Sequence, residues 1–290
     1  MSKTIVQIYE VQRQSEAEKL VSLGVDHIGS VLMESGRWKQ PALRRCVGSV
    51  QAGGAKSVLI PLTQDPVKIF SALDYYRPDF VHLCDALPPG PDNHRAAVRE
   101  FDALLTLQID LKDRFPQIDI MRSVSVPTPG VSDAPAIEKN ILQTLEMFAP
   151  VSDYFLIDTL LADLRQPVEG FVGITGEVCD WDMAAAIIGA SPIPVILAGG
   201  ISGGNVYEAI TRLRPAGVDS CTKTNAVDRA GNPVRFRKDM KKVRELLEEG
   251  RRRRKLLERH RALSLELAKV RMRGGDAEKK TTGHLPRCPR

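Results

Sequence analysis

Eight short apolar segments, each followed by a longer polar stretch, constrain the fold of this chain more than any other feature. They are rich in Val, Ile and Leu and show little alternation of apolar and polar residues, as is typical of parallel strands covered on both faces. The segments are residues 4–9, 27–33, 57–62, 80–84, 118–126, 154–158, 195–198 and 218–222. This repetition predicts an α/β protein built on a parallel sheet.

The stretches between these segments carry helix signals. Residues 15–23 have acidic residues early and are followed by Gly24, which favours a helix end there. Asp65 and Pro66 read as a cap followed by proline at the first helical position, and residues 92–115 are amphipathic. Strands alternating with helices eight times predict a (β/α)8 TIM barrel, which needs about 250 residues. An open doubly wound sheet has the same local pattern and stays an alternative on periodicity alone.

Charge divides the chain in two. Residues 250–290 hold 14 Lys and Arg and 4 Asp and Glu, a net charge of +10, whereas residues 1–249 hold 27 and 32, a net charge of −5. We therefore predict a barrel over residues 1–249 and a basic C-terminal tail over 250–290, helical at first and then disordered. The tail could attract nucleic acid but offers no aromatic side chain for stacking, so a solvated, partly helical extension is the expectation. Packing of its leucine face on the barrel or on another subunit is a further alternative.

Several classes of protein are disfavoured by composition. The chain has no run of 18 apolar residues and no signal-peptide pattern at its start, so we expect a cytoplasmic protein that does not enter a membrane. Five cysteines without a CxxC pair suggest neither a disulfide framework nor a zinc site. No metal or cofactor is expected, and the sequence leaves open whether the protein is a monomer or a homodimer.

The stretch VILAGGISGGNV, residues 195–206, ends an apolar strand in Gly199 and Gly200. Chemistry in a barrel lies where strands end, and a glycine backbone can approach an anion closely. The next strand end supplies Thr222 and Lys223, which suit phosphate oxygens. These residues predict a phosphate site, although the glycines could also serve only a tight turn.

Two charged residues at other strand ends fit such a site. Asp158 ends the apolar segment YFLID, and Arg37 follows the second predicted strand. A carboxylic acid and a guanidinium at a barrel rim are a plausible proton donor and anion clamp. A surface ion pair or a loop cap is the alternative for each.

Taken together, these stretches resemble the phosphoribosylanthranilate isomerase family, a barrel of tryptophan biosynthesis. The resemblance is carried by FLIDT at residues 155–159, GITGEVCDW at 173–181, VILAGGISGGNVYEAI at 195–210 and RPAGVDSCTKTNAVDRAGNPVRFRKD at 214–239. It spans residues 4–245 and is strongest in the last third. It implies an Amadori-type aldose–ketose isomerisation of a phosphoribosyl amine, with a phosphorylated small-molecule substrate.

The resemblance also implies roles for particular residues. Asp158 falls on the general acid that protonates the ribose ring oxygen, and Arg37 falls on the arginine that holds the anthranilate carboxylate. The other substrate-binding positions carried over are Gly173, Gly176, Gly199, Gly200, Asp219 and Thr222.

Departures from the family pattern put the general base in doubt. The family's catalytic cysteine is replaced by Tyr9, the glycine after it by Glu10, and the histidine of the fourth strand by Cys84. A phenol with a pKa near 10 is a poor base at neutral pH. Either Glu10 or Cys84 has taken over as base, or the barrel serves a different phosphorylated sugar, as a lyase, an epimerase or a non-catalytic binding protein. Lys223, in place of a family glycine, is expected to bind phosphate or to be a surface charge, and Schiff-base chemistry is disfavoured.

Overall fold

The computed structural model describes residues 3–33, 37–87, 95–161 and 167–252. Its contacts divide the chain into two units, Met1–Gly250 and Arg251–Arg290. The predicted tail lies almost entirely outside the described residues, so its helix and disordered end stay predictions.

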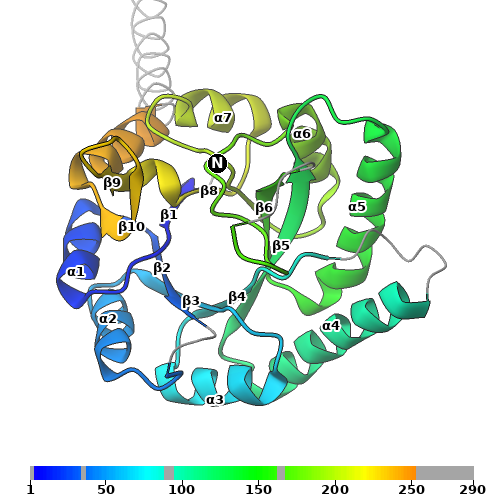
Figure 1. Cartoon of the computed structure of the whole chain (residues 1–290), viewed down its shortest axis with the longest axis horizontal. Helices are drawn as coiled ribbons and strands as arrows, with labels where there is room; N and C mark the ends of the chain where they lie inside the picture. The colour runs from blue at the N-terminus through cyan, green and yellow to red at the C-terminus, as the bar shows by residue number, and fades with distance from the viewer. Residues whose placement is uncertain (1–2, 34–36, 88–94, 162–166, 253–290) are drawn as a thin grey trace, which may run out of the picture. The chain divides into compact units, whose positions relative to one another are not determined.

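Eight parallel strands close into a barrel in the order of the sequence, with β1 paired to β8 (Figure 1). They are β1 (Ile5–Ile8), β2 (His27–Leu32), β3 (Lys56–Pro61), β4 (Phe80–Leu83), β5 (Asp119–Pro127), β6 (Tyr154–Leu160), β7 (Val195–Leu197) and β8 (Gly217–Ser220). Each predicted apolar segment overlaps one of them. The predicted (β/α)8 barrel is therefore confirmed, and the open sheet is excluded.

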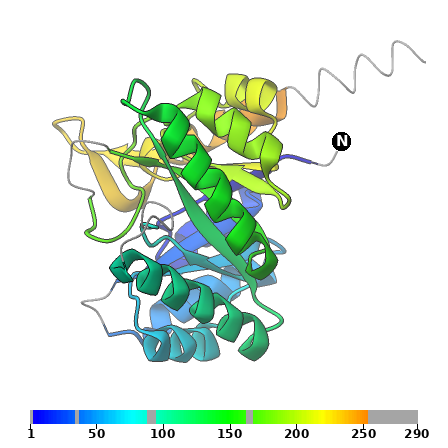
Figure 2. The same cartoon turned by 90° about the vertical axis from the view of Figure 1, so that its right-hand side faces the viewer.

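Helices surround this ring of strands (Figures 1 and 2). They are α1 (Gln14–Leu23), α2 (Pro41–Ala52), α3 (Pro66–Tyr76), α4 (Arg95–Arg114), α5 (Ala134–Phe148), α6 (Trp181–Ala190) and α7 (Val206–Leu213), with 3₁₀ turns η1 (Ala149–Val151) and η2 (Thr222–Thr224), and residues 240–250 are also helical. Gly24 ends α1 in the left-handed conformation, and the Asp65 carboxylate accepts the Val67 N–H at 2.9 Å. Both predicted helix boundaries are confirmed.

Two apolar layers hold the barrel together. The larger lies between the strands and the helices and includes Leu20, Leu111 and Phe155. The smaller fills the barrel interior with inward-facing side chains such as Tyr9 and Met121. Gly29 makes room for Tyr9, because a Cβ at position 29 would lie 1.7 Å from the tyrosine ring.

A hairpin that the sequence analysis did not predict follows β8. It consists of β9 (Asn225–Val227) and β10 (Pro233–Lys238), which pair antiparallel. The Lys238 N–H donates to the Glu16 carboxylate of α1 at 2.7 Å, and the Lys238 ammonium donates to the side-chain oxygen of Asn225 at 2.6 Å. The first bond holds the hairpin beside α1, and the second joins β10 to β9 within the hairpin.

The described ranges contain no helix that is long and apolar enough to cross a membrane. Nor do they contain a group of three or more His, Cys, Asp or Glu side chains placed to hold a metal ion.

Candidate active site

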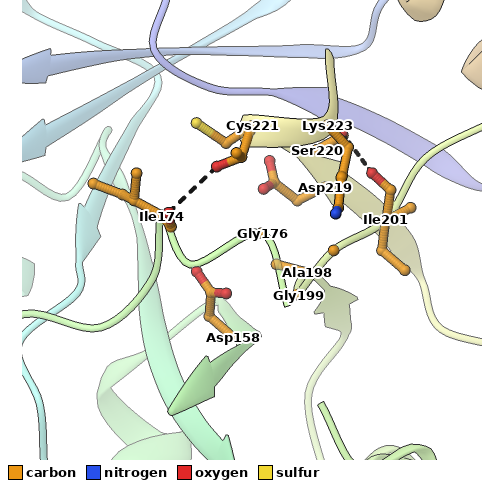
Figure 3. Close-up of a pocket in the computed structure, with 12 residues that line it drawn as sticks. Asp158, Ile174, Gly176, Ala198, Gly199, Ile201, Asp219, Ser220, Cys221 and Lys223 are labelled. Carbon is orange, nitrogen blue, oxygen red and sulfur yellow. Dashed lines mark hydrogen bonds between the residues drawn. The ribbon is translucent and has the colours of Figure 1, made fainter. Parts of the chain in front are cut away.

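The carboxyl ends of β6, β7 and β8 enclose a hollow of about 280 Å³ (Figure 3). Asp158 faces it from β6, and Lys223 faces it from the turn after β8. The predicted site residues that line it are Asp158, Gly176, Gly199, Gly200, Asp219, Thr222 and Lys223. The structure thus brings the predicted proton donor and the predicted phosphate-binding residues to one place.

Positions 199 and 200 require glycine because no side chain fits at either of them. Both have positive φ angles, 80° and 62°. A Cβ at Gly199 would lie 2.3 Å from the Thr159 hydroxyl oxygen, and one at Gly200 would lie 3.0 Å from the backbone of Gly176. The turn after β7 therefore presents bare backbone to the hollow, which is what close approach to an anion requires.

A second cavity, of about 530 Å³, lies next to the first and shares Asp158 and Asp219 with it. It is lined by the predicted residues Tyr9, Glu10, Cys84, Asp158, Gly173 and Asp219. Asp158 thus borders both a glycine-rich hollow and a more apolar one. A substrate with a phosphate at one end and an aromatic ring at the other would find both kinds of surface here.

The environment of Asp158 suits a proton donor. Burial raises the pKa of its carboxyl to about 6, although the Thr159 N–H, which donates to Oδ1 at 2.8 Å, lowers it. Gly173 lies against this carboxyl with φ at 110°, and a Cβ there would sit 2.3 Å from Oδ2. Gly173 therefore makes the space that Asp158 occupies.

Asp219 lies deeper, in β8, and is buried. Burial, and then the charge of Asp158, raise the pKa of Asp219 well above its usual value, against a hydrogen bond from Gln7. Its Oδ1 has no hydrogen-bond partner within the described part of the chain. A carboxyl in this setting favours its protonated form.

Comparison with known proteins identifies the chain. Residues 131–249 match the sequence profile of a family described as N-(5'-phosphoribosyl)anthranilate (PRA) isomerase. The N-(5'-phosphoribosyl)anthranilate isomerase of Methanocella arvoryzae is 31% identical over 207 residues, 71% of this chain and 78% of the relative. The chain belongs to the N-(5'-phosphoribosyl)anthranilate isomerase family.

Further relatives agree with this family. The N-(5'-phosphoribosyl)anthranilate isomerase of Methanosarcina acetivorans is 27% identical over 252 residues, 86% of this chain and 94% of the relative. A monomeric form of the dimeric Thermotoga maritima isomerase shares the fold with a TM-score of 0.59 at 19% identity, covering 86% of this chain and 98% of the other. The resemblance stated from sequence motifs is confirmed, and with it the expectation of an isomerase-family barrel.

Arg37 stands apart from the residues gathered in the two cavities. It is exposed and lines neither of them, and residues 34–36 just before it lie outside the described ranges. Its expected part in holding the anthranilate carboxylate therefore stays a prediction.

This family member departs from the family's motif at Tyr9, whose surroundings disfavour a role as base. The Tyr9 ring is buried and stacks on His82 with ring centroids 5.3 Å apart. Its hydroxyl donates to the Met121 sulfur at 3.5 Å. Burial raises the pKa of the phenol well above its usual value.

The cysteines of the site are also held in their neutral form. Cys84 directly follows β4 and is buried, and burial raises the pKa of its thiol far above the ordinary value. Burial does the same for Cys221. A thiol that stays protonated is a poor base.

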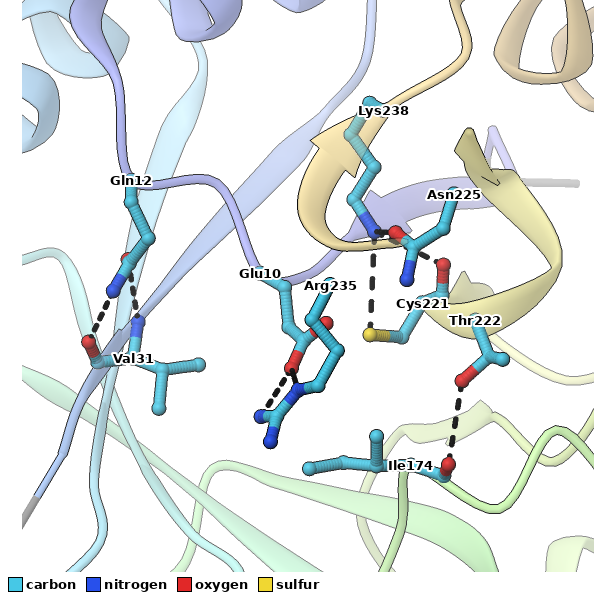
Figure 4. Close-up of polar contacts among 9 residues, drawn as sticks. All are labelled: Glu10, Gln12, Val31, Ile174, Cys221, Thr222, Asn225, Arg235 and Lys238. Atoms are coloured by element: carbon cyan, nitrogen blue, oxygen red, sulfur yellow. Dashed lines mark hydrogen bonds and ion pairs between the residues drawn. The ribbon is translucent and has the colours of Figure 1, made fainter. Parts of the chain in front are cut away.

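Arg235, in β10, is the site residue that sequence reasoning missed. Its Nε donates to Glu10 Oε1 at 2.6 Å (Figure 4). The stretch DRAGNPVRFRKD, residues 228–239, carries a usable signal, because Gly231 and Asn232 between two short apolar segments favour a hairpin. That pattern locates β10, but the partner of Arg235 follows only from the closed barrel.

Proposed function

We propose that this protein converts N-(5'-phosphoribosyl)anthranilate into 1-(o-carboxyphenylamino)-1-deoxyribulose 5-phosphate, the isomerisation step of tryptophan biosynthesis. The observation that carries the proposal is the position of Asp158, which borders the glycine-lined hollow with a pKa of about 6. An isomerase of the same family has been solved with a reduced form of that product.

In this proposal the phosphate lies against the backbone of Gly199 and Gly200. The Thr222 hydroxyl and the Lys223 ammonium, both lining the same hollow, are placed to complete its coordination. The hydroxyl now donates to the Ile174 carbonyl at 3.4 Å, a long bond that a phosphate oxygen could replace. The larger cavity takes the aromatic ring, since Val168, Phe171 and Ile60 line it.

Asp158 acts as the acid of the first step. It gives its proton to the furanose ring oxygen while the C1–O bond breaks, and the nitrogen lone pair forms a C1=N double bond. The product is an open-chain iminium ion, and Asp158 is left as a carboxylate. A pKa near 6 leaves a useful fraction of the acid protonated at neutral pH.

Complementation of a tryptophan auxotroph that lacks the isomerase tests this function. The full chain should restore growth, and Asp158→Asn should abolish it because the amide cannot give a proton to the ring oxygen. Asp228→Asn is the matched control, since Asp228 is an exposed carboxylate that only caps the hairpin turn. Growth that needs no Asp158 would contradict the proposed mechanism.

Absence of growth with the wild-type chain would contradict the activity itself. Assays with other phosphorylated sugars would then distinguish the two remaining hypotheses, an enzyme for a different phosphorylated sugar and a non-catalytic binding protein. Turnover of one of them would indicate a lyase or epimerase, and a thermal shift without turnover would indicate a binding protein.

A further inference from the structure

The proposed isomerisation needs a group that removes the proton from C2 of the open-chain sugar, and the family's cysteine is absent. We infer that Glu10 is this general base and that Arg235 is its positioning residue. The inference rests on the proposed function, because it assigns a step of that reaction.

The backbone at Glu10 directs its side chain to the site. Successive side chains of a strand point to opposite faces, so an extended residue after the inward-facing Tyr9 would point at the helix layer. Glu10 instead has φ at 61°, a left-handed conformation that non-glycine residues seldom adopt. With this conformation Glu10 lines the same cavity as Tyr9, Asp158 and Asp219.

Such backbone strain persists only where the surrounding structure holds it in place, and it gathers at functional sites. Glycine would adopt the same φ without strain. Glu10 therefore makes the folded protein less stable than a glycine at this position would. The feature that Glu10 supplies and a glycine lacks is a carboxylate.

The two carboxylate oxygens of Glu10 have different surroundings. Oε1 forms an ion pair with the Arg235 guanidinium (Figure 4). Oε2 is buried and has no hydrogen-bond partner among the described residues, and only 2% of the side chain is exposed. One oxygen thus holds the carboxylate in place, while the other has no partner and is available to accept a proton.

The other acidic groups in the cavity are poorer candidates. The Tyr9 phenol and the Cys84 thiol both have raised pKa values and stay protonated. Asp219 has a raised pKa as well and lies within β8, below the strand end. Asp158 is used by the first step, which leaves Glu10, held by Arg235, as the remaining carboxyl group that borders the cavity.

The reaction balances within the substrate and the two carboxylates. Glu10 takes the proton from C2 of the iminium ion, the C–H electron pair becomes the C1=C2 double bond, and the C1=N pair returns to nitrogen. The protonated Glu10 then gives this proton to C1, where the C1=C2 pair forms the new C–H bond, while the C2 O–H pair becomes the C2=O double bond of the ketose. The hydroxyl proton returns by way of solvent to the carboxylate of Asp158, which restores the acid. No oxidant or reductant is consumed.

Turnover of N-(5'-phosphoribosyl)anthranilate by the full-length wild type, Glu10→Gln and Glu10→Gly tests the assignment. Both variants should lose a factor of about 10²–10⁴ in kcat. Glu10→Gly should keep or raise Tm, because it removes the strained φ, and added formate should restore part of its activity. Glu18→Gln, an exposed glutamate on α1, is the matched control and should keep full activity.

Arg235→Met separates positioning from substrate binding. If Arg235 acts through Glu10, kcat falls and KM changes little, and Arg235→Lys regains part of kcat. A raised KM at unchanged kcat would overturn this role for Arg235.

Three outcomes overturn the assignment of Glu10 in distinguishable ways. A wild type without turnover would contradict both the proposed function and the assignment of Glu10 as its base. If the wild type is active and the Glu10→Gln and Glu10→Gly variants are equally active, the proposed function is supported. Only the assignment of Glu10 as the base is then contradicted. Loss of activity together with a lowered Tm in Glu10→Gly, without rescue by formate, would assign Glu10 a structural role instead.

Discussion

Replacing Gly173 by alanine should disable the proton donor without removing it. The new Cβ would lie 2.3 Å from Asp158 Oδ2, whereas a carbon–oxygen contact needs about 3.3 Å, so the carboxyl must move by about 1 Å. A displacement of this size at a reacting group costs on the order of 10² in rate. The φ of 110° adds about 1–3 kcal/mol of backbone strain to the folded state.

Gly170→Ala is the control for strain alone. Gly170 lies in the same loop with φ at 79°, and a Cβ there would meet nothing within 4 Å. We expect this variant to lose about 1–2 kcal/mol of unfolding free energy and to keep its kcat. Steady-state turnover and urea unfolding of both variants measure the two effects separately. Equal kcat values for Gly173→Ala and Gly170→Ala would refute the reasoning that Gly173 makes space for the acid.

Three further predictions concern charge. Because the acid works in its protonated form, kcat/KM should fall about tenfold per pH unit above pH 6. Asp158→Asn should gain stability over the wild type as pH rises from about 4 to 6, with no further gain above pH 6. A flat pH profile of either quantity would contradict a pKa of about 6. Asp85→Asn leaves the wholly buried Arg122 guanidinium without its ion-pair partner, 3.0 Å away, and should cost about 3–5 kcal/mol in urea unfolding. The exposed pair of Arg114 and Asp74 is its control, since Asp74→Asn should cost less than about 1 kcal/mol. Lys223→Met should raise KM about tenfold and weaken inhibition by inorganic phosphate, and an unchanged KM would place Lys223 outside the phosphate site.

Much of the fold could be predicted because buried parallel strands have a simple signature. The apolar segments reflect coverage on both faces, and Gly24 and Asp65 mark helix boundaries by local chemistry alone. The β9–β10 hairpin escaped prediction because its strands are short and partly exposed, so their composition resembles that of a loop.

The site residues that lie at or near strand ends could be predicted from the sequence. Asp158 lies near the end of β6, whereas Gly199 and Lys223 follow the ends of β7 and β8, and closing the barrel brings the three together. The orientation of Glu10 was not predictable, because it depends on a single left-handed backbone angle. Its partner Arg235 lies 225 residues away and is reached only through the fold.

The most direct test of the account is the rate at which the purified full-length protein consumes N-(5'-phosphoribosyl)anthranilate, measured for the wild type and Asp158→Asn side by side. We expect measurable turnover by the wild type and a loss of roughly 10²–10⁴ in the rate of the variant, with an aminodeoxyribulose phosphate as the product. A wild type without turnover, or a variant as fast as the wild type, would contradict it.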